Sequence, residues 1–492
     1  MCKCSVMDNS GNSPIREILA RAMKKGAGSK RVSPMLFFWI CVLTAVFTMI
    51  VCPVLDPFSR AYIARFNFLS MTRDTCSGKR IYTYDLPPKF NLELFNRSRC
   101  YKGLIYWMDL CPRFGNGGYG LKLWDDSKPH SVEEGGFDRS SWYDTDSYML
   151  EVIFHTRLKD YDCLTEDPAM ADAFFVPYYT GLQALVHLYP VETDESGRAL
   201  QLKERQNFGM ELIDWLEENG GEKWRRFGGR DHFIILGRTA WDFQFQDIWG
   251  TDFSRLPYVN NMTRLLIERD IDLSNEIAIP YPTSFHPSSP ERLTKWIEGV
   301  QNAERKFLFA YVGAPRSDIQ SVRGILGNQC VNAGEKVCKL VNCSIVRCSH
   351  DPVFIYRAFL QSNFCLQPRG DSTTRRSTFD CLISGAIPVF FHKDSSYTQY
   401  SLHLPKDFKS YSVFISEKDL VSKGVSIQDV LMTYSPRRIR AMRKKIVTLI
   451  PSLIYNDYVN DPQSSNRDAF EVSIAGVLDR VATAKRGLTR WI

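Results

Sequence analysis

A stretch that could bind an anion lies between two apolar runs in the second half of the chain. The segment FCLQPRGDSTTRRSTFDCLISGAIPVFF covers residues 364–391. Its start predicts a short strand from Phe364 to Leu366, which ends at Pro368 and Gly370. A helix is then predicted, followed by a second strand from Ile387 to Phe391. The loop of such a unit presents backbone N–H groups and the positive end of the helix dipole, so it favours a bound anion.

The predicted helix has a hydroxyl-rich start and a basic first turn. The N-cap hydroxyls are expected from Ser372, Thr373 and Thr374, with the helix beginning at Arg375 and ending at Gly385. Three arginines would add positive charge there, namely Arg369, Arg375 and Arg376. The alternative is an exposed turn in which Arg376 and Asp380 form an i,i+4 ion pair of about 0.3–0.5 kcal/mol. We favour the anion site, because this much positive charge beside a helix N-terminus is best explained by a negatively charged ligand.

Strands and helices alternate on both sides of a Pro- and Ser-rich stretch near residues 280–300. Before it, strands are predicted within residues 79–84, 172–177 and 231–239, and helices near Asp146 and over 211–219. After it, KFLFAYVGAPRSDIQSVRGIL repeats the pattern of strand, loop and helix. This order is typical of α/β proteins, and it predicts two Rossmann-like domains that face a cleft, with ligands at the carboxyl ends of the strands.

The hydropathy and charge pattern also predicts a membrane anchor near the N-terminus. A chain of 492 residues with a net charge of +7 is long enough for two domains, and its charge does not indicate nucleic acid binding. Residues 35–55 carry no charge and could cross a bilayer as one helix. Basic residues precede this span, which predicts a cytosolic N-terminus and a type II membrane protein. Cys2 and Cys4 are weak candidates for acylation.

The cysteines and sequons indicate an oxidising lumen. Ten of the 14 cysteines lie beyond the span, so all ten can pair, and Cys100 with Cys111 is expected to staple one loop. Four cysteines from Cys330 to Cys348 could suggest zinc, but their spacing lacks a C-x2-C pair, so disulfides are favoured. Three N-x-S/T sequons predict N-glycosylation, at Asn96, Asn261 and Asn342.

Several segments together resemble the exostosin-like glycosyltransferases of family 47, and within them the plant xyloglucan galactosyltransferase group. These segments are IYTYDLPPKFN, CLTEDPAMADAFFVPYYTGL, GRDHFIILGRTAWDF, IPYPTSFHP, GAPRSDIQSVRGILGNQC, the stretch from residue 364 onward, and YTQYSLHLP. They run in the family's order over about residues 79–480. The resemblance implies a GT-B fold in a Golgi type II enzyme that uses a nucleotide-sugar donor, inverts the anomeric carbon and needs no metal.

The expected organisation follows from the span and the resemblance. Residues 1–34 would be a cytosolic tail, 35–55 the signal anchor and 56–78 a stem. Residues 79–290 would form the N-terminal acceptor domain, and 291–492 the C-terminal nucleotide-sugar domain. The partners would be a UDP-sugar, xyloglucan or a related hemicellulose, the membrane, and other Golgi glycosyltransferases in complexes, with no cofactor and no nucleic acid.

The donor site is expected on two loops of the second domain. Arginines and a helix N-terminus would stabilise the diphosphate leaving group, while Asp380 would bind the ribose hydroxyls. Many relatives have Glu at this position, and whether the shorter Asp side chain reaches the ribose is left open. The expected donor-binding residues are Gly313, Arg316, Arg323, Gly370, Asp371, Ser372, Thr374, Arg375, Arg376 and Asp380.

Inversion needs a general base, which is expected from the first domain. Asp242 is the first choice, followed by His232, Glu151 and then His155. The alternatives are a core role for His232 and a helix pair of Glu151 with His155. Two tryptophans could stack on acceptor sugars or be structural, namely Trp241 and Trp249.

Other functions remain as alternatives. The sequence DTD at residues 144–146 and DID at 270–272 imitate a metal-binding D-x-D motif, which would hold the diphosphate through Mn²⁺ in another glycosyltransferase architecture. A tripeptide is a weak pattern in a chain with 55 acidic residues, so metal is not expected. The favoured function is transfer of galactose from UDP-galactose to xylose side chains of xyloglucan. A different donor sugar or hemicellulose comes second, and an inactive glycan-binding scaffold third.

Overall fold

The computed structural model describes residues 74–105, 108–123, 139–189, 204–205, 207–244, 250–314, 318, 320–345, 348, 352–457 and 467–489. Residues Cys76–Ile492 form one compact unit. The predicted tail and signal anchor, Arg316 and Trp249 lie outside the described residues. Within the described ranges, no helix is both long and apolar enough to span a bilayer.

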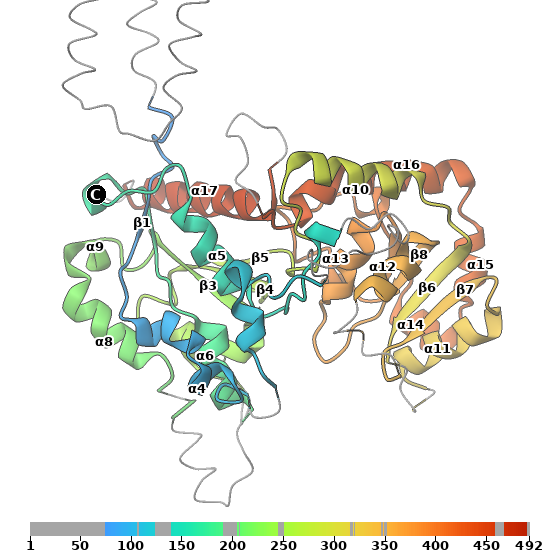
Figure 1. The fold of residues 1–492 in the computed structure, drawn as a ribbon, viewed down its shortest axis with the longest axis horizontal. Coiled ribbons are helices and arrows are strands. Elements are labelled where there is room, and N and C mark those ends of the chain that lie inside the picture. The colour runs from blue at the N-terminus through green and yellow to red at the C-terminus, as the bar shows by residue number, and fades with distance from the viewer. Residues whose placement is uncertain are drawn as a thin grey trace, which may run out of the picture. The chain divides into compact units, whose positions relative to one another are not determined.

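The first half is built on a five-stranded parallel sheet (Figure 1). Its strands are adjacent in their order along the chain, namely β1 (Ile81–Thr83), β2 (Ala173–Phe175), β3 (His232–Thr239), β4 (Thr263–Glu268) and β5 (Glu276–Ala278). Both faces are buried, as continuous apolar runs predict: Phe233 and Ile235 of β3 lie in one core, and Ile234 lies in another.

The second half has a parallel sheet with a different strand order, β10-β9-β8-β6-β7. The strands are β6 (Phe307–Gly313), β7 (Cys338–Asn342), β8 (Ser362–Gln367), β9 (Ile387–Phe390) and β10 (Val413–Phe414). Because β7 and β8 lie on opposite sides of β6, the direction of the strand order reverses between β6 and β8. Such a reversal is the point of an open α/β sheet at which ligands usually bind.

The α-helices of the described residues connect these strands or cover the sheets. In the first half they are α4 (Arg97–Cys100), α5 (Leu150–Lys159), α6 (Thr180–Leu188), α8 (Met210–Asn219) and α9 (Gly221–Arg225). The remaining helices are α10 (Pro290–Asn302), α11 (Val322–Ala333), α12 (Pro352–Leu360), α13 (Arg376–Ile383), α14 (Glu417–Lys423), α15 (Ile427–Met432), α16 (Pro436–Leu449) and α17 (Ala469–Thr489). Local signals start several of them: Ser289, Ser321 and Ser435 each cap a helix with the side-chain oxygen.

The C-terminal helix α17 packs with the first half, where Figure 1 shows it near α5. Arg157 of α5 donates to Asp468, which lies just before α17, and the rings of Phe154 and Phe470 are 5.2 Å apart. Lys485 near the end of α17 donates to the carbonyl oxygen of Asp172, beside β2. The sequence-based division of the chain between residues 290 and 291 did not predict that α17 packs against the first half.

The ten cysteines beyond residue 75 form five disulfides, which confirms the prediction of full pairing. The pairs are Cys76–Cys163, Cys100–Cys111, Cys330–Cys338, Cys343–Cys348 and Cys365–Cys381. The predicted staple of Cys100 with Cys111 is among them. The four cysteines that could have suggested zinc are joined in two of these disulfides.

The β-loop-α-β unit of the first motif is confirmed as β8, α13 and β9, with β8 parallel to β9. One detail was wrong: the helix begins at Arg376, its N-cap is Arg375, and no side chain caps it. The predicted capping hydroxyl of Thr374 instead donates to Glu268, at the end of β4. Gly385 has a φ of 69°, which suits glycine and follows the helix end as predicted.

Candidate functional site

Two loops meet at the strand reversal of the second sheet. One follows β6 and leads through Ala314 to α11, and the other follows β8 and leads from Pro368 to α13. Both leave the carboxyl ends of adjacent parallel strands. The two helix N-termini that follow the loops favour negative charge at this edge.

Two arginines occupy this edge. Arg323, in the first turn of α11, donates to the carbonyl oxygen of Ala314 at 2.7 Å. Burial and the nearby charge of Arg323 lower the pKa of Arg375, while Tyr281 and Asp371 oppose that shift. Among the described residues, neither Arg323 nor Arg375 forms an ion pair with a carboxylate. Two partly buried guanidinium groups of like charge are therefore close together, an arrangement that an anion would stabilise.

Gly370 makes room for one of these arginines. A Cβ atom at this position would overlap the Nη2 atom of Arg375, and the other close atoms belong to the same guanidinium group. The backbone N–H of Gly370 donates to the carbonyl oxygen of Ser372 at 2.9 Å, which shapes the loop. Gly313 ends β6 and is less restricted, because the atoms nearest to a Cβ added there belong to Tyr311 and lie 3.5 Å or more away.

The start of α13 contacts the first half directly. The backbone N–H and the hydroxyl of Thr374 both donate to Oε2 of Glu268, each at 2.7 Å. The hydroxyl of Tyr281 lies 2.9 Å from the hydroxyl oxygen of Thr374. Sequence reasoning missed Glu268, although a carboxylate at the end of the apolar strand TRLLIE was a usable signal.

Arg376 also reaches the first half. Its guanidinium donates to the carbonyl oxygen of Thr145 at 2.5 Å and to the hydroxyl of Ser284 at 2.6 Å. Its Nε atom lies 3.7 Å from Asp380, which is the i,i+4 pair of the structural alternative.

Asp380 is enclosed by protein. It is 3% exposed, and its Oδ1 atom accepts a 2.6 Å hydrogen bond from the hydroxyl of Tyr356. Burial raises the pKa of Asp380, and the charge of Arg376 partly offsets that rise. The prediction that Asp380 reaches the ribose does not fit this position, because both oxygens face protein groups. We therefore leave Asp380 out of the proposed donor site.

Asp242 lies in the turn after β3, at the carboxyl edge of the first sheet. It is 2% exposed, and its Oδ2 atom accepts from Nε of Arg238 at 2.6 Å and from the hydroxyl of Thr239 at 3.2 Å. The Arg238 guanidinium also lies 4.2 Å over the ring of Tyr148. Burial raises the pKa of Asp242, partly offset by Arg238. The position of Asp242 is compatible with a general base, whereas its ion pair with Arg238 is typical of a structural residue. The catalytic role of Asp242 stays a prediction.

Glu151, in the first turn of α5, is buried against backbone donors. Its Oε1 atom accepts from the N–H groups of Gly181 and Gly237, and its Oε2 atom accepts from Leu182. Burial raises the pKa of Glu151 to about 7, although these backbone hydrogen bonds oppose the rise. Glu151 thus joins α5 to the start of α6 and to β3, with no open face for a substrate.

His232 is at the wrong end of its strand for catalysis. It begins β3, whereas the second half contacts the carboxyl edge of the same sheet, at Glu268. It is fully buried between Tyr84 and Asp231, at 2.9 and 2.8 Å, and burial lowers its pKa. These contacts match the alternative of a core histidine, so we leave His232 out of the proposed site. His155 contacts the hydroxyl of Tyr179 at 3.0 Å, and burial lowers its pKa to about 4.

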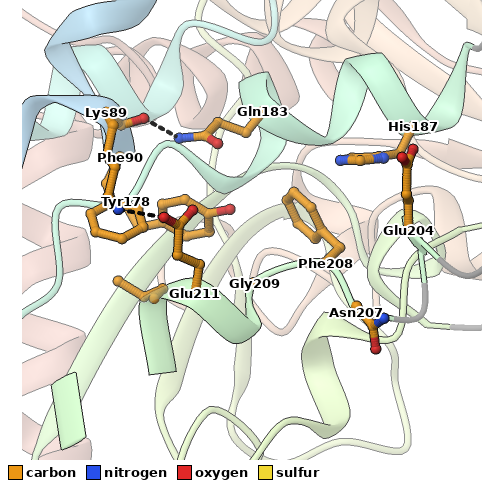
Figure 2. Close-up of a pocket in the computed structure, with 11 residues that line it drawn as sticks. Lys89, Phe90, Tyr178, Gln183, His187, Glu204, Asn207, Phe208, Gly209 and Glu211 are labelled. Atoms are coloured by element: carbon orange, nitrogen blue, oxygen red, sulfur yellow. Dashed lines mark hydrogen bonds and ion pairs between the residues drawn. The ribbon is translucent and has the colours of Figure 1, made fainter. Parts of the chain in front are cut away.

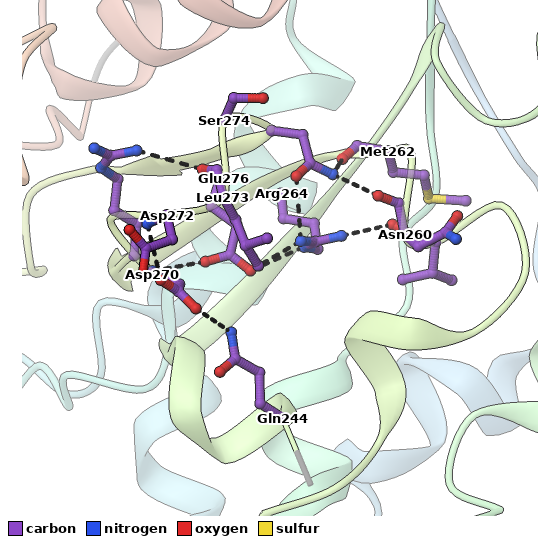
Figure 3. A network of polar contacts seen from close by, with 12 residues as sticks. Gln244, Asn260, Met262, Arg264, Asp270, Asp272, Leu273, Ser274 and Glu276 are labelled. Carbon is purple, nitrogen blue, oxygen red and sulfur yellow. Dashed lines mark hydrogen bonds and ion pairs between the residues drawn. The ribbon is translucent and has the colours of Figure 1, made fainter.

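Three of the four aspartates in the two D-x-D tripeptides interact with protein donors. Asp144 pairs with Arg113, and Asp146 accepts from the N–H of Tyr148. Figure 3 shows Asp270 accepting from Gln244 and from the N–H of Asp272, within a network that braces β4 and β5. In the part of the chain that the structure describes, no cluster of three His, Cys, Asp or Glu side chains could hold a metal ion.

The first half also contains a cavity of about 420 Å³, after the carboxyl ends of β1 and β2 (Figure 2). Phe90, Tyr178 and Phe208 supply its apolar wall, and Gln183 and His187 are among its polar residues. Figure 2 shows Gln183 donating to the carbonyl oxygen of Lys89 at one end of the cavity. Trp241 is 40% exposed after β3 and remains free to contact a sugar.

The sequons lie at different degrees of exposure. Asn96 is exposed between two short helices, and Asn342 is half-buried at the end of β7. Asn261 is half-buried and donates to the carbonyl oxygen of Gly228 at 2.9 Å. Glycosylation at all three positions stays a prediction.

Comparison with known proteins places the chain in a family. An Exostosin GT47 domain matches residues 75–431. The xyloglucan galactosyltransferase MUR3 of Arabidopsis thaliana is 38% identical over 87% of this chain, which spans 66% of MUR3. From the same plant, the probable xyloglucan galactosyltransferase GT12 is 40% identical (84% of this chain, 78% of GT12) and the xyloglucan galactosyltransferase XLT2 is 37% identical (83% and 76%). Among solved structures, the GtfA/B complex covers 68% of this chain and 60% of its own, with 8% identity and a TM-score of 0.31, too low to support an argument. The matched domain and these relatives agree over most of the chain, which therefore belongs to the Exostosin GT47 family.

Proposed function

We propose that this protein is an inverting glycosyltransferase that transfers galactose from UDP-galactose to xylose side chains of xyloglucan. The names of the relatives supply the transferred sugar and the acceptor. The observation that carries the reaction type is the meeting of Arg323 and Arg375 at the strand reversal, with no carboxylate paired to either among the described residues.

The two arginines suit the leaving group of this reaction. Negative charge grows on the diphosphate as the bond to the sugar breaks, and guanidinium groups held in place stabilise that charge. The N-termini of α11 and α13 also favour a bound anion at this edge. We propose that the donor site also includes other residues of both loops and of the elements beside them, namely Gly313, Arg316, Gly370, Asp371, Ser372, Thr374 and Arg376.

We propose a GT-B arrangement, with the sheet of β6 to β10 binding the donor and the sheet of β1 to β5 binding the acceptor. The contact of Thr374 with Glu268 supports it, because it joins the carboxyl edges of the two sheets. Trp241 and the cavity beside Tyr178 are the proposed contacts for the glucan chain. Aromatic faces and polar side chains together suit a neutral sugar.

We propose that the enzyme is a Golgi type II membrane protein, with a lumenal catalytic part that joins complexes with other glycosyltransferases. The five disulfides support an oxidising compartment. A fragment from Thr75 onward should be secreted from plant or animal cells in glycosylated form. If endoglycosidase leaves its gel mobility unchanged, the lumenal assignment is wrong.

The test of the function is a panel of UDP-sugars with xyloglucan oligosaccharides and other hemicelluloses. We expect turnover with UDP-galactose and xylosylated glucan, and β-linked galactose in the product. Turnover with another pair would instead support the related enzyme of different specificity. Oligosaccharide binding without turnover on the whole panel would support an inactive scaffold.

We also propose that turnover needs no metal, since arginines and helix N-termini can stabilise the diphosphate. Activity should then persist in EDTA. Loss of activity in EDTA that Mn²⁺ restores would contradict both this proposal and the GT-B assignment.

A further inference from the structure

We propose that Glu268 is a catalytic residue, the general base that takes the proton of the acceptor hydroxyl. The inference rests on the proposed transfer reaction and goes beyond its donor site. Inversion requires such a base at the join of the two halves. Glu268 is the last residue of β4, at the carboxyl edge of the first sheet.

Among the described residues, only one oxygen of Glu268 accepts hydrogen bonds. Oε2 accepts both hydrogen bonds from Thr374 at 2.7 Å. Oε1 accepts no hydrogen bond from a described residue, and the atom is not fully buried. The residue is 8% exposed, so Oε1 is the part of the side chain that solvent reaches. A carboxylate with one anchored oxygen and one open oxygen is suited to accept a proton.

Its position is fixed from both halves. Because the hydroxyl proton of Thr374 goes to Glu268, the hydroxyl of Tyr281 must donate to Thr374, and burial keeps that tyrosine protonated by raising its pKa. The next residue, Arg269, donates from its Nε atom to the carbonyl oxygen of Thr398 at 3.0 Å. Thr374 thus holds the end of β4 against the loop that carries Arg375, and Thr398 holds it against the segment after β9.

The neighbouring carboxylate is less suited to the role by its contacts. Asp242 is held in an ion pair with the Arg238 guanidinium at 2.6 Å. In the part of the chain that the structure describes, Glu268 accepts hydrogen bonds only from the neutral groups of Thr374. Glu268 also contacts the donor half directly, whereas the side-chain hydrogen bonds of Asp242 to Arg238 and Thr239 stay within the first half.

The reaction balances as a single displacement. A xylose hydroxyl oxygen forms a bond to the anomeric carbon of galactose while the bond from that carbon to the UDP oxygen breaks. The electron pair leaves with UDP, whose charge Arg323 and Arg375 would stabilise. The hydroxyl proton passes to Oε1 of Glu268, and solvent then removes it.

The test uses the secreted, disulfide-bonded protein with Glu268→Gln, Glu268→Ala and a control, Asp272→Asn. Gln keeps an oxygen to accept both bonds from Thr374 but cannot take a proton. Asp272 is an exposed carboxylate just beyond the same strand. We expect kcat for Glu268→Gln to fall about 10²–10⁴-fold, with UDP affinity and thermal stability near wild type. Formate should partly restore Glu268→Ala, and Asp272→Asn should behave as wild type.

The outcomes are distinct. If Glu268→Gln keeps kcat within tenfold, or loses UDP affinity and stability along with kcat, the base assignment is wrong. Loss of kcat in Asp242→Asn with activity retained in Glu268→Gln would also overturn it, in favour of Asp242. If the wild type turns over no donor and acceptor pair, the proposed function fails instead.

Discussion

Arg157 and Asp468 form an ion pair of 2.7 Å that joins α5 to the residue before α17, with side chains 10% and 0% exposed. Asp468 also accepts from the N–H of Asn456 at 3.0 Å. Arg157→Ala would leave a buried carboxylate without its partner, so we expect a loss of about 3–5 kcal/mol in the free energy of unfolding. Urea denaturation measures it. Lys423→Ala, in an exposed pair with Asp419, is the control and should cost about 0.5 kcal/mol or less.

Arg375→Ala should weaken UDP binding. Loss of one charge-assisted contact to the diphosphate is expected to cost about 1.5–3 kcal/mol, or roughly 10- to 150-fold in Kd. Calorimetry with UDP measures the change. Arg440→Ala removes the same charge from an exposed position on α16 and should leave the affinity unchanged. Equal effects of both variants would show that only the total charge matters.

Gly370→Ala should separate binding from stability. The added methyl group displaces only the end of the flexible Arg375 side chain, so the midpoint of thermal unfolding should change little. UDP affinity should fall toward that of Arg375→Ala. Gly299→Ala, in α10 with open space around it, is the control for a change from glycine and should be neutral or stabilising. Unchanged UDP affinity in Gly370→Ala would remove Arg375 from the site.

Asp380→Asn should lower stability and leave UDP affinity unchanged. The amide keeps the shape but gives up the charge beside Arg376 and places a donor within a buried site. Thermal unfolding and UDP calorimetry on the same preparation distinguish the two effects. A clear loss of UDP affinity in a variant of normal stability would restore the predicted ribose contact.

Glu151 should make stability depend on pH. Its folded-state pKa is raised from 4.5 to about 7, so its contribution is fully present below pH 4.5 and is lost as the pH rises through about 7. We expect wild-type stability, relative to Glu151→Gln, to fall between about pH 4.5 and pH 7, by at most about 1.4 kcal/mol per pH unit. Urea denaturation of both proteins across this range gives the difference. A constant difference would mean that Glu151 does not titrate there.

The sequence predicted the strands and the helix on either side of the loop after β8, but not the residues that this loop contacts. The apolar runs around residues 364 and 387 placed β8 and β9 correctly, because buried parallel strands need little more than local hydrophobicity. The use of Thr374 could not be seen, since its acceptor, Glu268, lies 106 residues away. A hydroxyl at the start of a helix can cap that helix or donate to a distant carboxylate, and only the fold decides between these partners.

The candidate bases show the same limit. Asp242 and Arg238 are four residues apart, so their pairing was visible in principle, but the strand and turn between them had to be known first. His232 and Asp242 flank one strand, and the sequence alone did not reveal which end of it faces the other half. An alternating pattern of strands and helices predicts the order of the elements along the chain. A site depends instead on which strand ends meet in the fold.

The return of α17 has a consequence for how the protein folds during synthesis. Arg157 and Asp468 are 311 residues apart, so the first half lacks its last helix until nearly the whole chain has been made. Contacts of such high sequence separation form late and slow folding. The surface of α5 that α17 and the residue before it contact is therefore expected to stay uncovered in the nascent first half until the end of the chain has been made. A chain that ends before Asp468 would lack both this ion pair and α17, and it is expected to be less stable than the full chain.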